Sequence, residues 1–307
     1  MKLDAHVHTC HSGYSTIGPL RRIMRESYNT PEAVYRLAKA RGMDLVAITD
    51  HDTIAGALTL AGRPDVIVGC EVTGAFAHDG VRVHLNVFDV TERQHREIDR
   101  LRGDLRELLP YLRGERIFTS LNHVASRING EITAAHIGAL LPWIDALEVI
   151  NGSRLRAQNR TAAAIAESAR KVGIAGSDAH THRGIGCTWV EAPQAVDRAS
   201  FLSEMRAGRV VTAGREGHFF TMASDISRFA VNMYAEHGFR LLQRPWLWRR
   251  QALVLGLAAG VPMFAAALAI ALGHFVLEAR FNRALLFDLV RRPALAPRSV
   301  AALLEVA

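Results

Sequence analysis

The sequence predicts an α/β fold in which a mostly parallel sheet closes into a barrel, and three observations support this prediction. Short runs of β-forming residues alternate with helical patterns over roughly residues 1–215. Histidines and acidic residues close nearly every one of these runs. The chain has 307 residues, of which 49% are hydrophobic. This length and composition are sufficient for one large barrel with a full core.

Seven apolar runs are the predicted strands, and each is short enough to cross one sheet. In chain order they are Lys2–His8, Asp44–Thr49, Asp65–Thr73, Val81–Val90, Ile117–Asn122, Ala146–Ile150 and Gly173–Gly176. The stretches between them are helical or loop patterns. The clearest helix is Pro31–Arg41, where Thr30 is the expected N-cap and Pro31 the first helical residue. Gly42 is expected to end it.

The composition limits the compartment and the partners. The formal charge is +7, which suits an anionic substrate, a nucleic acid or an acidic membrane surface. The three cysteines, Cys10, Cys70 and Cys187, are too few and too scattered for a disulfide framework. The N-terminus opens as a strand rather than as a signal peptide. We therefore expect a cytoplasmic catalytic part, with no obligate protein partner evident.

The C-terminal third has a different character and predicts membrane attachment. Residues 252–277 carry no charge, and a straight helix of this length would be roughly 39 Å long against a hydrocarbon core of about 30 Å. Trp246 and Trp248 precede this stretch, where an aromatic belt is expected. The sequence thus predicts a helical connector at 216–250, a hydrophobic membrane segment at 251–278 and a basic tail at 279–307. The barrel would lie at the cytoplasmic face of a membrane.

The topology of this segment stays open at the level of sequence. Arginines flank both of its sides, which conflicts with a simple positive-inside orientation. Gly260, Val261 and Pro262 near its middle could bend it into a hairpin. The alternative is an alanine-rich helix buried in the soluble domain.

The histidines and acids predict a metal centre at the carboxyl ends of the strands. His6 and His8 are two residues apart, so a strand points both imidazoles the same way. Asp178 and His180 repeat this spacing near the end of the barrel. Histidine combined with carboxylate suits Mn, Zn or Fe, and Glu71 could bridge two ions. We expect two or three divalent ions.

These motifs together resemble the PHP (polymerase and histidinol phosphatase) superfamily. The matching elements are HVHT from His6, ITDHDT around His51, GCEVT around Glu71, HL at His84, NH at His123 and GSDAH ending at His180. The resemblance covers roughly residues 1–215. It implies a distorted (β/α)7 barrel of PHP type that hydrolyses phosphoesters with two or three metal ions.

The resemblance also implies a ligand set. The first ion would be held by His6, His8, Glu71 and Asp178; the second by Glu71, His84 and His123; and a third by His51 and His180. Many members supply the third ion with an acid or histidine a few residues after HxHT, where this chain has Gly13. His11 is the alternative ligand, and the third site stays open.

The expected reaction is hydrolysis of a small phosphomonoester or phosphodiester, nucleotide-like, by a metal-activated water. His180 or His51 would protonate the leaving oxygen if it is free of metal. Arg183, Arg154 and Asn151 follow strand ends and are the expected substrate-binding residues.

Three other functions fit the sequence less well. One is an exonuclease acting on short RNA or DNA, although the aromatic residues expected of a single-strand platform are few. The second is a metal-dependent amidohydrolase, since similar barrels host C–N bond hydrolysis. The third, from a different class, is a non-catalytic metal-binding regulatory module at the membrane.

Overall fold

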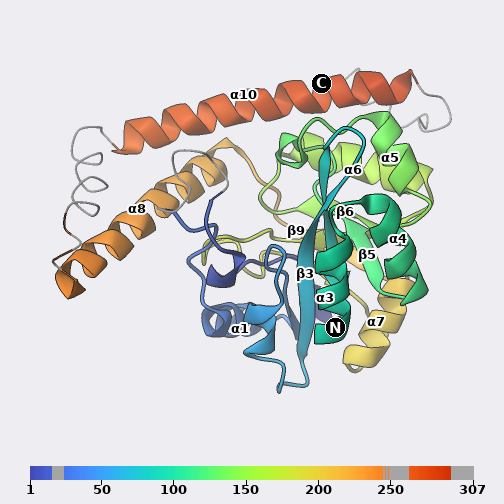
Figure 1. Cartoon of the computed structure of the whole chain (residues 1–307), viewed down its shortest axis with the longest axis horizontal. Helices are drawn as coiled ribbons and strands as arrows, with labels where there is room; N and C mark the ends of the chain where they lie inside the picture. The colour runs from blue at the N-terminus through green and yellow to red at the C-terminus, as the bar shows by residue number, and fades with distance from the viewer. Residues whose placement is uncertain (16–23, 245, 247, 249–262, 292–307) are drawn as a thin grey trace.

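A nine-stranded sheet with the order β7-β6-β5-β4-β3-β2-β1-β8-β9 forms the centre of the fold (Figure 1). The structure is a computed structural model that describes residues 1–15, 24–244, 246, 248 and 263–291. Its strands are β1 (Lys2–Asp4), β2 (Leu45–Ile48), β3 (Val66–Ala75), β4 (Arg82–Phe88), β5 (Phe118–Leu121), β6 (Ala146–Asn151), β7 (Val172–Gly176), β8 (Thr188–Glu191) and β9 (Val211–Gly214). The first seven correspond to the seven predicted strands.

The prediction of a mostly parallel sheet is right for most of the barrel and wrong at β4. Strands β1, β2 and β3 pair in parallel, as do β5, β6 and β7. Strand β4 is antiparallel to both β3 and β5. The physical reason is the connection between Ala75 and Arg82, which is too short for the crossover that parallel strands need. Strands β8 and β9 extend the sheet from β1, also antiparallel.

The sheet nearly closes because β1 and β7 meet at their carboxyl ends. Val7 and Ala179 form a parallel bridge just beyond the two strands. The amide of Ala5 donates to the carbonyl of Ala175 over 3.3 Å, and the amide of Asp178 donates to the carbonyl of His6 over 2.8 Å. The result is the barrel-like α/β fold that the sequence predicted.

Helices cover the outside of this sheet. They are α1 (Pro31–Ala40), α2 (Ala55–Leu58), α3 (Glu92–Leu101), α4 (Leu105–Gly114), α5 (Ala134–Leu140), α6 (Arg156–Ser168) and α7 (Arg198–Arg206), with short 3₁₀ turns η1 (Cys10–Ser12) and η3 (Arg127–Asn129). Helix α1 begins at Pro31 as predicted, because the Thr30 side chain accepts from the amide of Ala33. It ends at Ala40, one residue before the predicted end at Arg41, and Gly42 beyond it adopts a φ of 83°.

Two long C-terminal helices, α8 (Phe219–Gln243) and α10 (Met263–Val290), complete the described chain. Figure 1 shows α10 running across one end of the barrel, next to α5 and α6. Its Leu285, Leu286 and Leu289 belong to the same buried apolar cluster as residues of α4, α5 and α6. Glu278 of α10 also faces the barrel, since it accepts from the Gln158 side chain over 2.5 Å.

The described residues do not support the predicted membrane segment at 251–278. In the described ranges, no helix combines the length and the apolar character needed to cross a bilayer. Residues 251–262 lie outside the described part of the chain. Residues 263–278 belong to α10, which continues through the expected boundary at 278 into the expected tail. Buried contacts of Glu278 and Asn282 with the barrel explain why this helix is not a lipid-facing span.

Candidate metal centre

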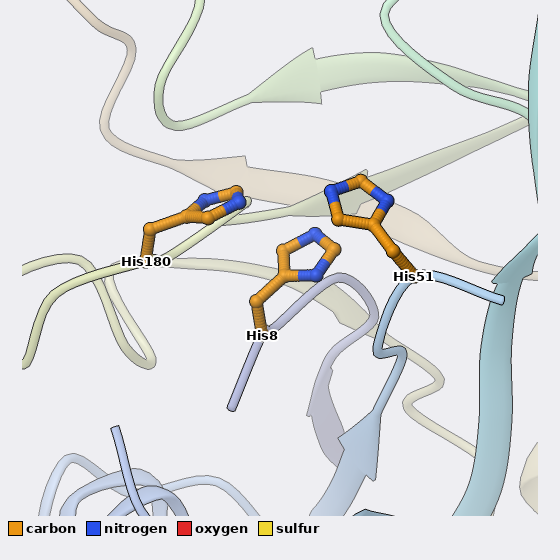
Figure 2. A group of neighbouring side chains, drawn as sticks. All are labelled: His8, His51 and His180. Carbon is orange, nitrogen blue, oxygen red and sulfur yellow. The ribbon is translucent and has the colours of Figure 1, made fainter. Parts of the chain in front are cut away.

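All eight predicted metal ligands converge at one end of the barrel. His6 and His8 follow β1, His51 follows β2, Glu71 lies in β3, His84 in β4, His123 follows β5, and Asp178 and His180 follow β7. The reversal of β4 explains why His84 lies near the start of its strand, opposite Thr73, and still reaches the same end. Figure 2 shows His8, His51 and His180 gathered around a common space.

Glu71 is the centre of this group. Its carboxylate is fully buried and lies among five imidazoles. The distances to Oε1 are 3.0 Å from His123 Nε2, 3.3 Å from His84 Nδ1 and 3.3 Å from His6 Nε2, and those to Oε2 are 3.0 Å from His51 Nδ1 and 3.3 Å from His8 Nε2. One carboxylate thus faces nitrogens delivered by four different segments of the chain, because His6 and His8 both follow β1. A carboxylate placed in this way could be shared by two ions.

Asp178 forms the second acidic pole of the centre. Its Oδ1 lies 3.4 Å from Nε2 of His8 and 3.4 Å from Nδ1 of His180. Its other oxygen, Oδ2, accepts from Arg154 Nη2 over 3.0 Å and from the Asn151 side chain over 3.2 Å. The carboxylate therefore has one oxygen fixed by the protein and one directed at the histidines.

The donor set fits divalent metal ions. Four overlapping groups of three residues have ligand atoms within 4.8 Å of one another: His6–His8–Glu71, His6–His123–Asp178, His51–Glu71–His84 and His8–His51–His180. Within the described chain, the buried Glu71 Oε2 and His84 Nδ1 make no hydrogen bond. The Nε2 atoms of His6 and His8 face each other at 3.0 Å. Cations would satisfy these crowded acceptors, and imidazole with carboxylate suits Zn, Mn or Fe.

The electrostatics of the centre keep its acids ionised. Burial raises the pKa of Glu71, but the neighbouring His6, His84 and His51 outweigh burial and hold it well below its ordinary value. Burial acts the same way on Asp178, and His6 and Arg154 likewise hold its pKa well below the ordinary value. For His180, burial and the neighbouring His8 lower the pKa well below the usual range. Ionised carboxylates and a neutral imidazole are the forms that bind metals.

Two carboxylates outside the ligand set, Glu148 and Asp50, orient the imidazoles, and the sequence did not single out Glu148. Glu148 Oε1 lies 2.9 Å from His6 Nδ1, and its Oε2 accepts from the amide of His123 over 3.0 Å. Asp50 accepts from Ser12 Oγ, which lies 3.1 Å from His8 Nδ1. Such contacts fix the ring tautomer and direction. The available signal for Glu148 was a single acid within the buried strand β6.

Two of the ligand residues also have unusual backbone conformations. His123 has a φ of 26° and Asp178 a φ of 50°, in the left-handed region that non-glycine residues seldom adopt. Such conformations persist only where surrounding contacts hold them, and they gather at functional sites.

The expected substrate-binding residues lie in different environments. Asn151 and Arg154 are buried and bonded to Asp178, so they hold the centre together from outside. Arg183 lies on an exposed loop and lines a pocket of about 530 Å³ together with Arg156 and Arg215. Their roles toward substrate stay predictions.

His51 and His180, the residues expected at a third site, lie beside His8, and the ligand atoms of the three are within 4.8 Å of one another. The side chains of His51 and His180 are 22% and 18% exposed, whereas His8 is fully buried. These two histidines therefore form the open side of the centre. His11 is absent from the groups of potential ligands among the described residues.

A second group of histidines has a structural role. His78 and His136 both contact Asp79, at 3.2 and 2.8 Å. The Nδ1 of His136 accepts from the amide of Thr133, so its Nε2 carries the proton and donates to Asp79. This arrangement joins the β3–β4 hairpin to α5 and leaves no lone pair of His136 for a metal.

The fold and the site together define a barrel protein with a buried histidine–carboxylate centre that can hold divalent ions. Residues 156–210 match the family model described as PHP-associated. This match begins at α6 and ends just before β9.

A stretch of 77 residues is 34% identical to an uncharacterised protein of Methanocaldococcus jannaschii. It covers 24% of this chain and 44% of that protein, so the chain spans less than half the length of the curated relative.

The fold resembles that of a two-domain protein from Bacteroides vulgatus containing a predicted PHP-like metal-dependent phosphoesterase, with a TM-score of 0.52 and 15% identity. The match covers 70% of this chain and 64% of that one, so it shows a shared fold over part of the solved protein. A lesion-specific endonuclease from Pyrococcus furiosus is more distant, with a TM-score of 0.47, 16% identity and coverage of 69% of this chain and 58% of that one.

Proposed function

We propose that the protein is a metal-dependent phosphoesterase that hydrolyses a small, nucleotide-like phosphomonoester or phosphodiester. The observation that carries the proposal is Glu71, whose two oxygens face five imidazoles from four segments of the barrel. A carboxylate shared in this way can hold two ions a few ångströms apart. The likeness of the fold to a solved protein that contains a predicted PHP-like metal-dependent phosphoesterase supports the assignment to a metal-dependent hydrolase.

The chain supplies the positions for two or three ions. His6, His8, Glu71 and Asp178 would hold one, and a second would lie between Glu71, His84 and His123, where both histidines face Oε1 of Glu71. Bound divalent ions lower the pKa of a water and neutralise charge on a phosphoryl oxygen. Glu148 and Asp50 fix the directions of His6 and His8, so that the ligand lone pairs point inward.

His51 and His180 are assigned to the open side, where substrate would enter. Burial and the neighbouring His8 lower the pKa of His180, which favours its neutral form and therefore a ligating role for a third ion. We assign His51 as the alternative proton donor to the leaving oxygen when it is free of metal. Arg183, on the loop after His180, is the proposed phosphate contact on the exposed side.

A substrate panel tests this proposal directly. The full-length chain, supplied with Mn²⁺ or Zn²⁺, is assayed with p-nitrophenyl phosphate, bis-p-nitrophenyl phosphate and a short single-stranded RNA. Hydrolysis that Glu71→Gln abolishes and Glu167→Gln retains is expected, since Glu167 is exposed on α6. Cleavage of only the RNA would assign the chain to the exonuclease alternative. Stoichiometric metal without any hydrolysis would favour the regulatory alternative.

We further propose that the catalytic barrel works at the cytoplasmic face of a membrane. Large apolar side chains stay exposed at the end of α8 and just beyond it, with Leu242 82% and Trp246 73% exposed. Exposed tryptophan and basic side chains favour the surface of an anionic bilayer. Flotation of the full-length chain with phosphatidylglycerol vesicles is the expected result. Recovery of all folded protein below the vesicles would contradict it.

A further inference from the structure

A second polar pocket lies at the end of the barrel opposite the metal centre. It has a volume of about 380 Å³ and is lined by residues that precede β5, β6 and β7, among them Ile117, Asp145 and Lys171. His123 follows the other end of β5, and Asp178 and His180 follow the other end of β7. At about 3.3 Å per residue, strands of this length separate the two sites by roughly 15–20 Å.

Positive charge dominates this pocket. We call it the basic pocket and define it by Arg113, Arg116, Trp143, Lys171 and Arg206. In the part of the chain that the structure describes, none of its four cations lies within 4.0 Å of a carboxylate. The single acid of the lining, Asp145, is already the acceptor for the amide of Thr119 at 2.8 Å. The pocket therefore carries four cations against one carboxylate, and the charge of that carboxylate, Asp145, acts on Lys171.

Protein contacts position the cations of the basic pocket, and these contacts use only some of their N–H donors. The Lys171 ammonium donates to the carbonyl of Ile144 over 2.6 Å, and Arg206 donates to the carbonyl of Arg116 over 2.9 Å. Arg113 lies over the ring of Trp143, with 5.6 Å between the guanidinium carbon and the ring centroid. An ammonium has three N–H donors and a guanidinium five, so most of them stay available. Burial lowers the pKa of Lys171, and the neighbouring Arg113 acts in the same direction, whereas the carboxylate of Asp145 partly offsets them.

The end of α4 places Arg116 at the pocket. Arg116 has a φ of 55°, and the amide of Ile117 donates to the carbonyl of Leu112 over 2.9 Å, which is the usual hydrogen-bond pattern of a helix end. The end of α6 repeats this pattern at Arg170, where the amide of Lys171 donates to the carbonyl of Ala166 over 2.8 Å. Two helix ends thus bring Arg116 and Lys171 to the same pocket.

We propose that the basic pocket binds a small phosphorylated molecule at a site separate from the metal centre. Guanidinium groups bind phosphate with two parallel hydrogen bonds, and the Lys171 ammonium supplies a further charge-assisted donor. Arg113 covers one face of the Trp143 ring, and the ring is still 37% exposed, so an aromatic base could stack on the uncovered part next to the phosphate. The ligand class is thus a mononucleotide or a simpler phosphate. The assignment does not depend on the reaction at the metal centre.

Titration calorimetry with inorganic phosphate and with AMP tests this site. The host is the full-length Glu71→Gln chain, which lacks the proposed turnover, with wild type titrated with phosphate in parallel. Lys171→Gln and Arg206→Gln, each added to this host, are expected to weaken binding about tenfold, equivalent to about 1.4 kcal/mol. Arg100→Gln, an exposed cation on α3 that pairs with Glu97, should change nothing.

The comparison of AMP with inorganic phosphate shows whether the pocket recognises a nucleotide or phosphate alone. Tighter binding of AMP than of phosphate, lost in Trp143→Ala, would identify a nucleotide, and equal binding would identify phosphate alone. Thermal unfolding monitored by circular dichroism checks that each variant is folded. Binding that is unchanged in folded Lys171→Gln and Arg206→Gln, or undetectable at millimolar ligand, would overturn the proposal.

Discussion

The role of each residue at the metal centre depends on its neighbours more than on its own residue type. Arg154 followed a strand end and was expected to contact substrate, yet it is buried against Asp178. Glu148 was not singled out from sequence, yet it contacts both His6 and His123. The sequence was sufficient to identify His6 and His8 as a pair, because side chains two residues apart on a strand point to the same face. Asn151 and Arg154, which donate to Asp178, follow a different strand, and a single sequence does not show which strands lie side by side.

Glu148→Gln tests the role of an orienting carboxylate. The substitution keeps the size of the side chain and removes the charge that faces His6 Nδ1. Metal affinity should fall about 10–100-fold, the usual effect of losing such a partner, with the fold retained. Competition with a chromophoric chelator measures this affinity, and Glu167→Gln is the matched control. An affinity equal to that of wild type would show that His6 is oriented without Glu148.

At the scale of elements, turn chemistry and connection length explain what the sequence predicted. Helix α1 begins at Pro31 because Thr30 caps it, and this was readable from three consecutive residues. The reversal of β4 follows from the short connection after Ala75, which the strand assignment alone did not use. The face of α10 that packs against the barrel could not be predicted from the sequence, because its apolar residues lie all around the helix.

Asp65, just before β3, contacts Tyr35 and Lys39 of α1. From these contacts we predict that the stability of the protein depends on pH. Burial raises the pKa of Asp65, but the hydrogen bonds from Lys39 and Tyr35 outweigh burial and lower it. A lowered folded pKa stabilises the protein above the unfolded pKa of about 3.9, and this contribution is lost as the pH falls through the folded value. The loss of unfolding free energy in Asp65→Asn should therefore be largest above about pH 5 and shrink toward pH 3.

Chemical denaturation of wild type and Asp65→Asn between pH 3 and 7 measures this difference. Glu32→Gln is the control, since Glu32 belongs to an exposed pair with Arg63 that contributes little. A destabilisation by Asp65→Asn that stays constant over this pH range would rule out the ionic origin.

For the whole molecule, the barrel and the C-terminal helix α10 form one packed unit. The sequence predicted a division between a catalytic barrel and a membrane segment, on the basis of hydropathy. Hydropathy does not distinguish a lipid-facing helix from one that packs on protein. Contacts of Glu278 with Gln158 and of Asn282 with Thr161 supply that distinction, and they join residues more than a hundred positions apart.

Leu289→Ala tests the packing of α10 on the barrel. Leu289 is fully buried, so its truncation should lower the unfolding free energy by about 2–5 kcal/mol. Phe287→Ala on the same helix should have a much smaller effect, because Phe287 is 49% exposed. Urea denaturation compares the three proteins. Equal stabilities of Leu289→Ala and wild type would show that α10 is not part of the folded core.

The central claim is that Glu71 bridges a multinuclear metal centre, and metal stoichiometry tests it most directly. The full-length chain is equilibrated with Mn²⁺ or Zn²⁺, dialysed, and analysed by inductively coupled plasma mass spectrometry beside Glu71→Gln and Glu167→Gln. We predict at least two ions per chain in wild type and in Glu167→Gln, and at most one in a folded Glu71→Gln chain. Wild-type stoichiometry in Glu71→Gln, or no retained metal in wild type, would contradict the account.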